Sequence, residues 1–202
     1  KAAVEGRLVP TEAALARTEG RDYEPASTLL ARILAERRAA WTASGTKGKY
    51  KEPIAPATEG SPELPEGWCW TTPDQVAARV TVGHVGSMKS RYCESGVPFL
   101  RSQNVRPNRF DWGGLLSIPL EFHAELEKSK VVPGDVLVVR SGSVGTACVL
   151  PEAVGEANCS DLVLVKRPRV EPNYLAYYIN AGATAEIERG KVGVALTHFN
   201  TA

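Results

Sequence analysis

Short apolar runs that end abruptly in polar residues mark the second half of the chain. Val97–Leu100, Val136–Val139 and Leu162–Val165 are runs of this kind. An unbroken apolar run of about four to eight residues is typical of a strand that is buried on both faces. We expect Val136–Val139, which is strongly β-prone, to be a central strand, with Thr146–Leu150 as its hairpin partner. Leu115–Ile118 predicts a further short strand.

Helical spacing of apolar residues is clearest between Ala26 and about Thr42, where Pro25 fits the first turn. The apolar stripe of this helix consists of Leu29, Leu30, Ile33, Leu34 and Trp41. Such a stripe is typical of a face that packs against the rest of a protein. The sequence therefore predicts one long amphipathic helix here.

The other predicted helices are shorter. They are Pro73–Val80, with Thr72 as a candidate N-cap, Pro119–Ser129 and Pro172–Asn180. Lys1–Gly6 looks like the end of a helix that began upstream, because Gly6 is well placed as a C-terminal stop. Thr11–Glu24 is polar and predicts a turn region.

The stretch Ala43–Pro62 is rich in Gly, Pro, Ser and Lys, a composition that does not pack a core. We interpret it as a linker and predict that the chain divides into residues 1–60 and residues 61–202. Leu64–Trp70 opens the second part with a turn at Pro65–Gly67. Trp68 and Trp70 then alternate as on a strand with one buried face.

The chain as a whole is nearly neutral, with a formal net charge of +1, so a strongly basic nucleic-acid binder is not indicated globally. The charge is uneven, however. Thr81–Phe110 contains five Lys or Arg residues and one acid, Glu94. A local basic patch matters more for phosphate contact than the charge of the whole chain.

The four cysteines show no C-x-x-C pattern and no zinc-finger spacing to the three histidines. This argues against a zinc site and fits a protein of the reducing cytoplasm. No apolar run approaches the roughly 18–20 residues that a membrane span needs, and no signal-peptide pattern is present. A first residue of Lys1 rather than Met is consistent with a piece of a longer protein.

Two predicted strands end in similar polar loops. Val97–Leu100 is followed by Arg101, Ser102, Gln103 and Asn104, and Val136–Val139 is followed by Arg140, Ser141, Gly142 and Ser143. Arginine can form two-pronged hydrogen bonds to guanine, and Asn or Gln can form them to adenine. Because function concentrates on loops that a rigid scaffold holds, two such tips favour a binding surface. Solvated polar turns are the alternative.

Motifs of the common enzyme classes are missing. The chain has no G-x-S-x-G elbow, no H-E-x-x-H, no Walker A loop, no dinucleotide fingerprint and no Asp-Pro-Pro-Tyr or Asn-Pro-Pro-Tyr. A carboxylate pair of Asp135 and Asp161 is conceivable, although Asp135 in Pro-Gly-Asp is more typical of a turn. His84 is more typical of a structural residue than of a catalytic one. We therefore predict that the chain has no catalytic activity of its own.

Six segments, taken in order, carry a resemblance to a known family. They are LPEGWCW (Leu64–Trp70), GVPFLRSQNV (Gly96–Val105), PGDVLVVRSGSVGTA (Pro133–Ala147), ANCSDLVLV (Ala157–Val165), PNYLAYYIN (Pro172–Asn180) and VGVALTHFN (Val192–Asn200). In these segments the chain resembles the target-recognition domain of the specificity (S) subunit of type I restriction–modification systems. Ala2–Pro10 and Glu24–Arg38 resemble the end of that family's conserved spacer region. A first recognition domain and a closing helix are missing, which leaves either an excerpt or a half-subunit that pairs with a second copy.

The resemblance implies an α+β fold: a mixed, twisted β-sheet recognition domain with short helices, preceded by helices from a coiled-coil spacer. It implies a non-catalytic DNA-binding subunit that reads one half of a split site in double-stranded DNA. The implied partners are methyltransferase (M) subunits, which use S-adenosylmethionine to methylate adenine, and restriction (R) subunits. The chain itself would bind no cofactor directly, no metal and no membrane.

On this interpretation, the polar residues of the two tips read bases: Arg101, Ser102, Gln103, Asn104, Arg140, Ser141 and Ser143. Basic residues nearby would contact phosphates: Lys89, Arg91, Arg106, Arg109, Lys191 and His198. The resemblance does not identify individual base contacts, which vary with the target sequence.

A second hypothesis is a protein-interaction scaffold that binds no DNA. The helix Ala26–Thr42 and the tryptophan pair would then dock a partner, and the basic loops would be solvated surface. Retention of residues 61–202 on DNA or heparin distinguishes the two. A third hypothesis, an enzyme on an unfamiliar β fold, requires a polar pocket that residue types alone do not reveal.

Overall fold

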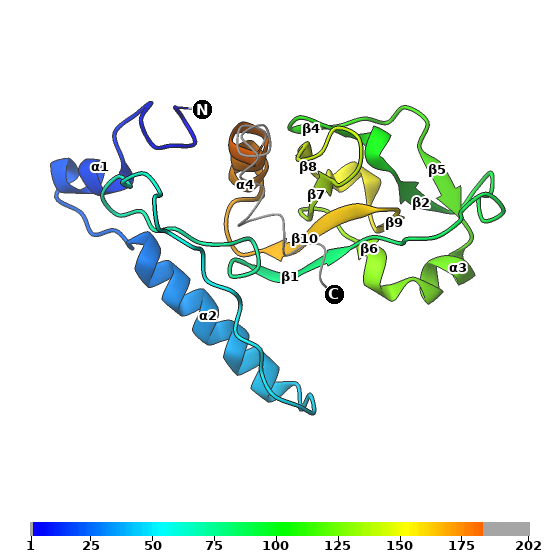
Figure 1. Ribbon diagram of the computed structural model, residues 1–202, viewed down its shortest axis with the longest axis horizontal. Helices are drawn as coiled ribbons and strands as arrows, with labels where there is room; N and C mark the ends of the chain where they lie inside the picture. The colour runs from blue at the N-terminus through cyan, green and yellow to red at the C-terminus, as the bar shows by residue number, and fades with distance from the viewer. Residues whose placement is uncertain (1, 184–202) are drawn as a thin grey trace. The chain divides into compact units, whose positions relative to one another are not determined.

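The computed structural model describes residues 2–183 and divides the chain into two compact units (Figure 1). Unit 1 is Lys1–Val76 and unit 2 is Ala77–Ala202. The linker composition predicted a boundary near residue 60, so the division lies later in the chain than expected. Residues 61–76 belong with unit 1 in the structure.

Unit 1 contains a helix that the sequence analysis missed. Helix α1, Glu12–Glu19, occupies most of Thr11–Glu24, and the prediction of a turn region there is wrong. Thr11 is the N-cap, and its hydroxyl accepts a hydrogen bond from Ala14 N at 3.2 Å. The stretch is helical because alanine, the strongest helix former, recurs in it between a capping threonine and a terminal Gly20 with a φ of 64°.

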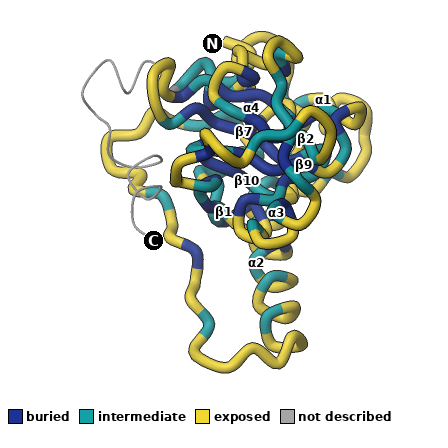
Figure 2. Tube along the Cα trace, turned by 90° about the vertical axis from the view of Figure 1, so that its right-hand side faces the viewer, coloured by how far each residue is buried: buried dark blue, intermediate teal, exposed yellow. Residues whose placement is uncertain are grey.

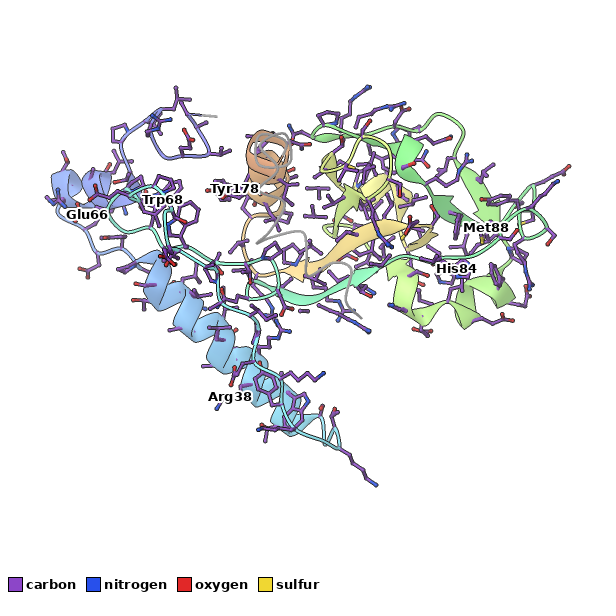
Figure 3. All side chains as sticks on the ribbon, in the orientation of Figure 1. Arg38, Glu66, Trp68, His84, Met88 and Tyr178 are labelled. Carbon is purple, nitrogen blue, oxygen red and sulfur yellow. The ribbon has the colours of Figure 1, made fainter. Side chains whose placement is uncertain are left out.

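The predicted long helix is confirmed as α2, Ala26–Ala43. Of its apolar stripe only Ile33 is buried, and the other members are half-buried. The chain after α2 returns along its last turns: Trp41 contacts Tyr50 at a ring distance of 5.5 Å, and Arg38 lies over the same ring (Arg38 is labelled in Figure 3). The stretch interpreted as a linker has no helix or strand beyond α2, but it contacts that helix.

No strand forms at Leu64–Trp70, so that prediction is wrong. The turn is present, because Trp68 N donates to Pro65 O at 3.1 Å. Trp68 packs instead against Gly6, where a Cβ atom would lie 2.7 Å from the indole. The described part of unit 1 contains no strand with which this segment could pair, and an isolated strand is not stable.

Gly6 has the geometry expected of a residue that ends a helix. Its φ is 65°, and Arg7 N donates to Ala2 O at 2.9 Å while Gly6 N donates to Ala3 O at 3.1 Å. This pair of hydrogen bonds is the Schellman motif of helix C-termini.

The described residues of unit 2 contain two four-stranded sheets and a two-stranded ribbon, together with short helices (Figure 1). The first sheet has the order β1-β10-β7-β8 and is antiparallel, and the second has the order β5-β2-β9-β6, in which β2 and β9 are parallel. The strands of the first sheet are β1 Ala77–Val82, β7 Val136–Val139, β8 Ala147–Val149 and β10 Leu162–Pro168. Those of the second are β2 Val97–Leu100, β5 Leu116–Ile118, β6 Lys130–Val131 and β9 Ala157–Cys159, and the ribbon is β3 Val105–Arg106 and β4 Arg109–Phe110.

Three apolar clusters hold these elements in layers. Leu137 and Leu164 of the first sheet pack with Leu100 and Cys159 of the second, which makes the central core. Helix α4, Pro172–Tyr178, covers the other face of the first sheet. The other face of the second sheet packs against the side chains of α3 and of the segment before β2.

Strands β7 and β10 are therefore covered on both sides, as their buried colour in Figure 2 shows. This explains why Val136–Val139 does not alternate between apolar and polar residues, and it confirms the predicted central strand. Helix α3, Leu120–Glu125, with a 3-10 turn at Glu127–Ser129, and α4 confirm two of the predicted short helices. The fold is of the predicted mixed α+β class.

The predicted helix Pro73–Val80 is wrong. Pro73–Gln75 forms a turn, which Thr72 caps by accepting from Gln75 N at 3.3 Å, and strand β1 follows directly. The residues of β1 pair along β10, with Arg79 opposite Lys166. Strand pairing over this length outweighs the local helix signal.

Strand β9 holds a polar side chain in the interior of unit 2. Asn158 lies in β9 and is fully buried. Its amide donates to Leu126 O at 3.2 Å and to His123 Nδ1 at 3.3 Å, and its oxygen accepts from the Ser129 hydroxyl. A buried amide with this many partners is stable inside a strand.

Candidate nucleic-acid interface

Several strand ends of unit 2 meet around Ser160 and Asp161. Because β2 and β9 are parallel, both end at the same edge, and Ser160 N donates to Leu100 O at 2.9 Å. The end of β7 lies at this edge too, since Val139 pairs with Leu162 at the start of β10. The loops after β2 and β7 therefore leave unit 2 from neighbouring positions.

Gly83 brings the end of β1 to the same place. Its N–H donates to Leu162 O at 2.8 Å, and the next N–H, of His84, donates to Cys159 O at 2.8 Å. A Cβ atom at Gly83 would lie 1.8 Å from Ser160 O, so only glycine allows this approach. His84 thus follows an anchored backbone position and serves the structure through its main chain.

The loop after β2, residues 101–114, is closed by the side chain of Asn104. This residue is fully buried. Its oxygen accepts from Arg101 N at 3.0 Å, and its amide donates to Asp111 O at 2.9 Å and to Gly113 O at 3.2 Å. In this position the Asn104 side chain holds the loop through three backbone contacts.

The other side chains of the first tip differ in exposure and in their hydrogen bonds to the loop. Arg101 Nη2 donates to Gly114 O at 2.8 Å, which draws the guanidinium toward the loop. Gln103 is exposed, and its amide lies 3.3 Å from Gly114 O at the limit of a hydrogen bond. Ser102 is exposed. Ser102 and Gln103 are thus the side chains of this tip that are most open to a ligand.

The tip between β7 and β8, residues 140–146, is held by a residue from another strand end. Arg140 Nη1 donates to Asp161 Oδ1 at 2.8 Å, and the Ser141 hydroxyl donates to Asp161 Oδ2 at 3.2 Å. Ser143 is exposed. Sequence analysis considered Asp161 only as a carboxylate partner of Asp135 and missed this contact, which joins residues 21 positions apart.

Asp135 and Asp161 do not form a carboxylate pair. Asp135 precedes β7, whereas Asp161 lies opposite the other end of that strand. Asp135 is fully buried and accepts from Val132 N at 3.0 Å and from Arg167 N at 2.7 Å. Burial raises the pKa of this carboxyl group. It is a turn residue, as Pro-Gly-Asp predicts.

Two of the candidate phosphate-binding residues lie on the β3–β4 ribbon. Arg106 and Arg109 face each other across it, and both are exposed. Arg106 Nε donates to Asp111 Oδ2 at 3.0 Å. The N–H of Gly113, and then Arg106, lower the pKa of Asp111.

The ribbon is tied to the second tip. Asn108 N donates to Ala147 O at 2.9 Å, next to the end of that tip. Asn180, just after α4, donates to Asn108 Oδ1 at 2.7 Å and exchanges two hydrogen bonds with the backbone of Ala147. The sequence gives no local signal for these contacts, because Asn108, Ala147 and Asn180 come from three distant segments.

Lys89 and Arg91 lie elsewhere, near the start rather than the end of β2. The guanidinium of Arg91 lies over the ring of Phe122 on α3, 4.7 Å from the ring centre. The backbone of Cys93 forms an isolated antiparallel β-bridge with Ser117 on β5. Met88 of the same segment packs into the apolar cluster beneath (Figure 3). The structure thus separates these two basic residues from the ribbon pair, while Lys191 and His198 lie outside the described residues.

Within residues 2–183, no group of His, Cys, Asp and Glu side chains could hold a metal ion. No helix in that range has both the length and the apolar character that crossing a membrane requires.

No protein-family model matches the chain, and no curated protein matches it in sequence. Two solved structures match most of it. One is a chain from a structure on the assembly and conformational transition of a type I R-M system, with 22% identity, a TM-score of 0.44, and coverage of 91% of this chain and 41% of that one. The other is the HsdS subunit of Thermoanaerobacter tengcongensis, with 18% identity, a TM-score of 0.43, and coverage of 84% and 39%. The chain thus spans about two fifths of the length of these two solved chains, and over most of its own length it is similar to a chain of a type I R-M system and to an HsdS subunit.

Proposed function

We propose that the chain is a sequence-specific DNA-binding module that reads one half of a split site and has no catalysis of its own. The observation that carries this proposal is the meeting of two arginine-bearing strand ends at one anchored edge of unit 2. Polar side chains on a rigid edge can be held in register with base edges, while flexible loops cannot.

In this proposal base readout belongs to the exposed and half-exposed residues of the two tips: Arg101, Ser102, Gln103, Arg140, Ser141 and Ser143. Phosphate contact belongs to Lys89, Arg91, Arg106, Arg109, Lys191 and His198. Arg106 and Arg109 are supported by their position on a ribbon tied to the second tip. Asn104 is assigned to positioning, because it is buried.

The proposed partners are double-stranded DNA, methyltransferase subunits and restriction subunits in the cytoplasm. S-adenosylmethionine would be bound by the methyltransferase and not by this chain. If the chain is a half-subunit, two copies would pair to restore a two-part site. The helices of unit 1 would then belong to the spacer that sets the distance between the half-sites.

The test is to co-express this chain with a type I methyltransferase subunit that co-purifies with it and to map N6-methyladenine across the host genome. A split motif that appears only when this chain is present supports the proposal and identifies the target. A palindromic split motif further indicates that two copies pair. No new methylation, although the two proteins co-purify, contradicts DNA reading by this chain.

A protein-interaction scaffold is the second candidate, and one observation favours it. Most of the apolar stripe of α2 is only half-buried, which leaves apolar surface on that helix. On this alternative the chain would bind the methyltransferase and would not be retained on duplex DNA. Electrophoretic mobility of random duplex DNA with the full chain separates the two functions.

A further inference from the structure

Asp161 lies where the ends of β2, β7 and β9 meet, and both of its carboxylate oxygens contact the 140–146 tip. Arg140 Nη1 lies 2.8 Å from Oδ1, and the Ser141 hydroxyl lies 3.2 Å from Oδ2. The backbone just before Asp161 is fixed, because Ser160 N donates to Leu100 O at 2.9 Å. An anchored carboxylate therefore orients a guanidinium that sits on a loop of small residues.

The tip itself contributes little to the orientation of Arg140. Gly142 and Gly145 have φ values of 85° and 83°, and residues 141–144 are exposed. Arginine has a long side chain that loses several rotatable bonds when it is held in one geometry. Asp161 has already restricted that freedom before any ligand arrives.

Arg140 keeps donors for a ligand while it contacts Asp161. A guanidinium has five N–H groups in a planar fork, and the structure assigns one nitrogen, Nη1, to the carboxylate. The Arg140 side chain is 36% exposed, so it is not enclosed by the rest of unit 2. A planar fork of this kind matches the O6 and N7 acceptors of guanine.

The charge of Asp161 is unfavourable for simple phosphate binding. Its side chain is 39% exposed, and a carboxylate at a DNA-binding edge repels the phosphate backbone. Its presence is favourable, however, if it keeps Arg140 from pairing with phosphates on any sequence, because selectivity depends on weakening the wrong contacts.

We propose that Asp161 is a specificity-determining positioning residue, which holds Arg140 for two-pronged hydrogen bonding to a guanine and keeps it from the phosphate backbone. This inference rests on the proposed DNA-reading function and adds to it the base that the second tip reads.

The test is to select bound sequences from a random duplex library with the full chain and three variants, and to sequence them. Asp161→Asn is expected to lower the preference for guanine at one position about tenfold. It is also expected to raise affinity for unrelated duplex DNA, with a salt slope steeper by up to about one, because the released Arg140 can neutralise a phosphate. Arg140→Lys, which keeps the charge but not the fork, should lose the same preference and keep its affinity for unrelated DNA.

Asp74→Asn is the matched control. Asp74 pairs with Arg37 inside unit 1 at 3.3 Å, and its side chain is 41% exposed, which is close to the value for Asp161. The substitution makes the same change in net charge and should leave the selected motif unchanged.

Each outcome separates the inference from the proposed function. If wild type selects a motif and Asp161→Asn selects the same motif with an undiminished guanine preference, the inference fails and the proposed function stands. If Asp161→Asn does not fold, as judged by circular dichroism, Arg140→Lys decides: a retained guanine preference overturns the inference. The inference is also overturned if the Asp161→Asn or Arg140→Lys variant loses its preference for a base other than guanine. If wild type selects no motif, the proposed function fails and the inference with it.

Discussion

The two polar tips of unit 2 follow the same sequence plan but are held in different ways. Both consist of a buried strand, an arginine and small polar residues. The 101–114 loop is closed by its own Asn104, which is buried and bonded to three backbone groups. The 140–146 tip depends on Asp161 from a different strand end. The same local plan therefore gives one loop that is rigid by itself and one whose arginine is oriented from outside.

The difference shows that a polar residue after a strand can have either of two roles. In the first loop the side-chain amide of Asn104, a group that can pair with adenine, is buried and closes the loop. In the second tip, glycine and serine offer no side chain that could do this, so the arginine stays at the surface and a distant carboxylate restrains it. Residue type alone does not separate these roles, because both use the same hydrogen-bonding groups.

The largest expected effect comes from removing the anchor that both tips share. Gly83→Ala places a Cβ atom 1.8 Å from Ser160 O and 2.7 Å from Cys159 Sγ. We expect the free energy of unfolding to fall by about 4 kcal/mol, since backbone must move to relieve the clash. Urea unfolding measures it. Gly182→Ala is the control, because among the described residues the nearest atoms to its Cβ belong to the Tyr178 ring at 3.9 Å, and equal stability of the two variants would contradict the anchor.

Asn104→Ala should affect stability more than any change at the second tip. It removes the hydrogen bonds of Asn104 to Arg101 N, Asp111 O and Gly113 O, which we expect to lower the free energy of unfolding by about 3 kcal/mol. Asp161→Asn should lower it by less than about 1 kcal/mol, because the Arg140–Asp161 pair is more than one third exposed. Thermal unfolding compares the two, and similar melting temperatures would mean that the loops are held alike.

Gln103→Ala should change recognition rather than stability. The side chain is exposed, and its hydrogen bonds to the loop lie at 3.3 and 3.4 Å. We expect relaxed specificity at one base pair, with about 1–3 kcal/mol of discrimination lost. Competition binding with single-base variants of the selected site measures this, and an unchanged preference at every position would remove Gln103 from base readout.

Lys89→Ala should have the smallest effect, and one that does not depend on sequence. Lys89 is exposed. We expect the affinity for duplex DNA to fall equally for all DNA sequences. The slope of log affinity against log salt concentration should fall in magnitude by about one. Lys51→Ala, an exposed lysine of unit 1, is the charge-matched control. If Gln103→Ala and Lys89→Ala weakened binding equally on every sequence, the division between base and phosphate contacts would be wrong.

Sequence reasoning succeeded where local chemistry is decisive. The apolar runs at Val97–Leu100, Val136–Val139 and Leu162–Val165 all became strands, and the stripe of α2 became a helix. It failed at Pro73–Val80 and Leu64–Trp70, where the presence or absence of a pairing strand decided the outcome. It also failed at α1, where alanines between two caps form a helix without an apolar stripe.

The sequence by itself determined which segments are apolar enough to be buried and which residues lie at their ends, because burial of apolar surface is a property of each segment. The tertiary structure alone decided that β2 and β9 run parallel, that Gly83 meets Ser160, and that Asp161 restrains Arg140. These contacts join segments far apart in the chain. They depend on strand order and register, which emerge only when the two sheets pack around a common core.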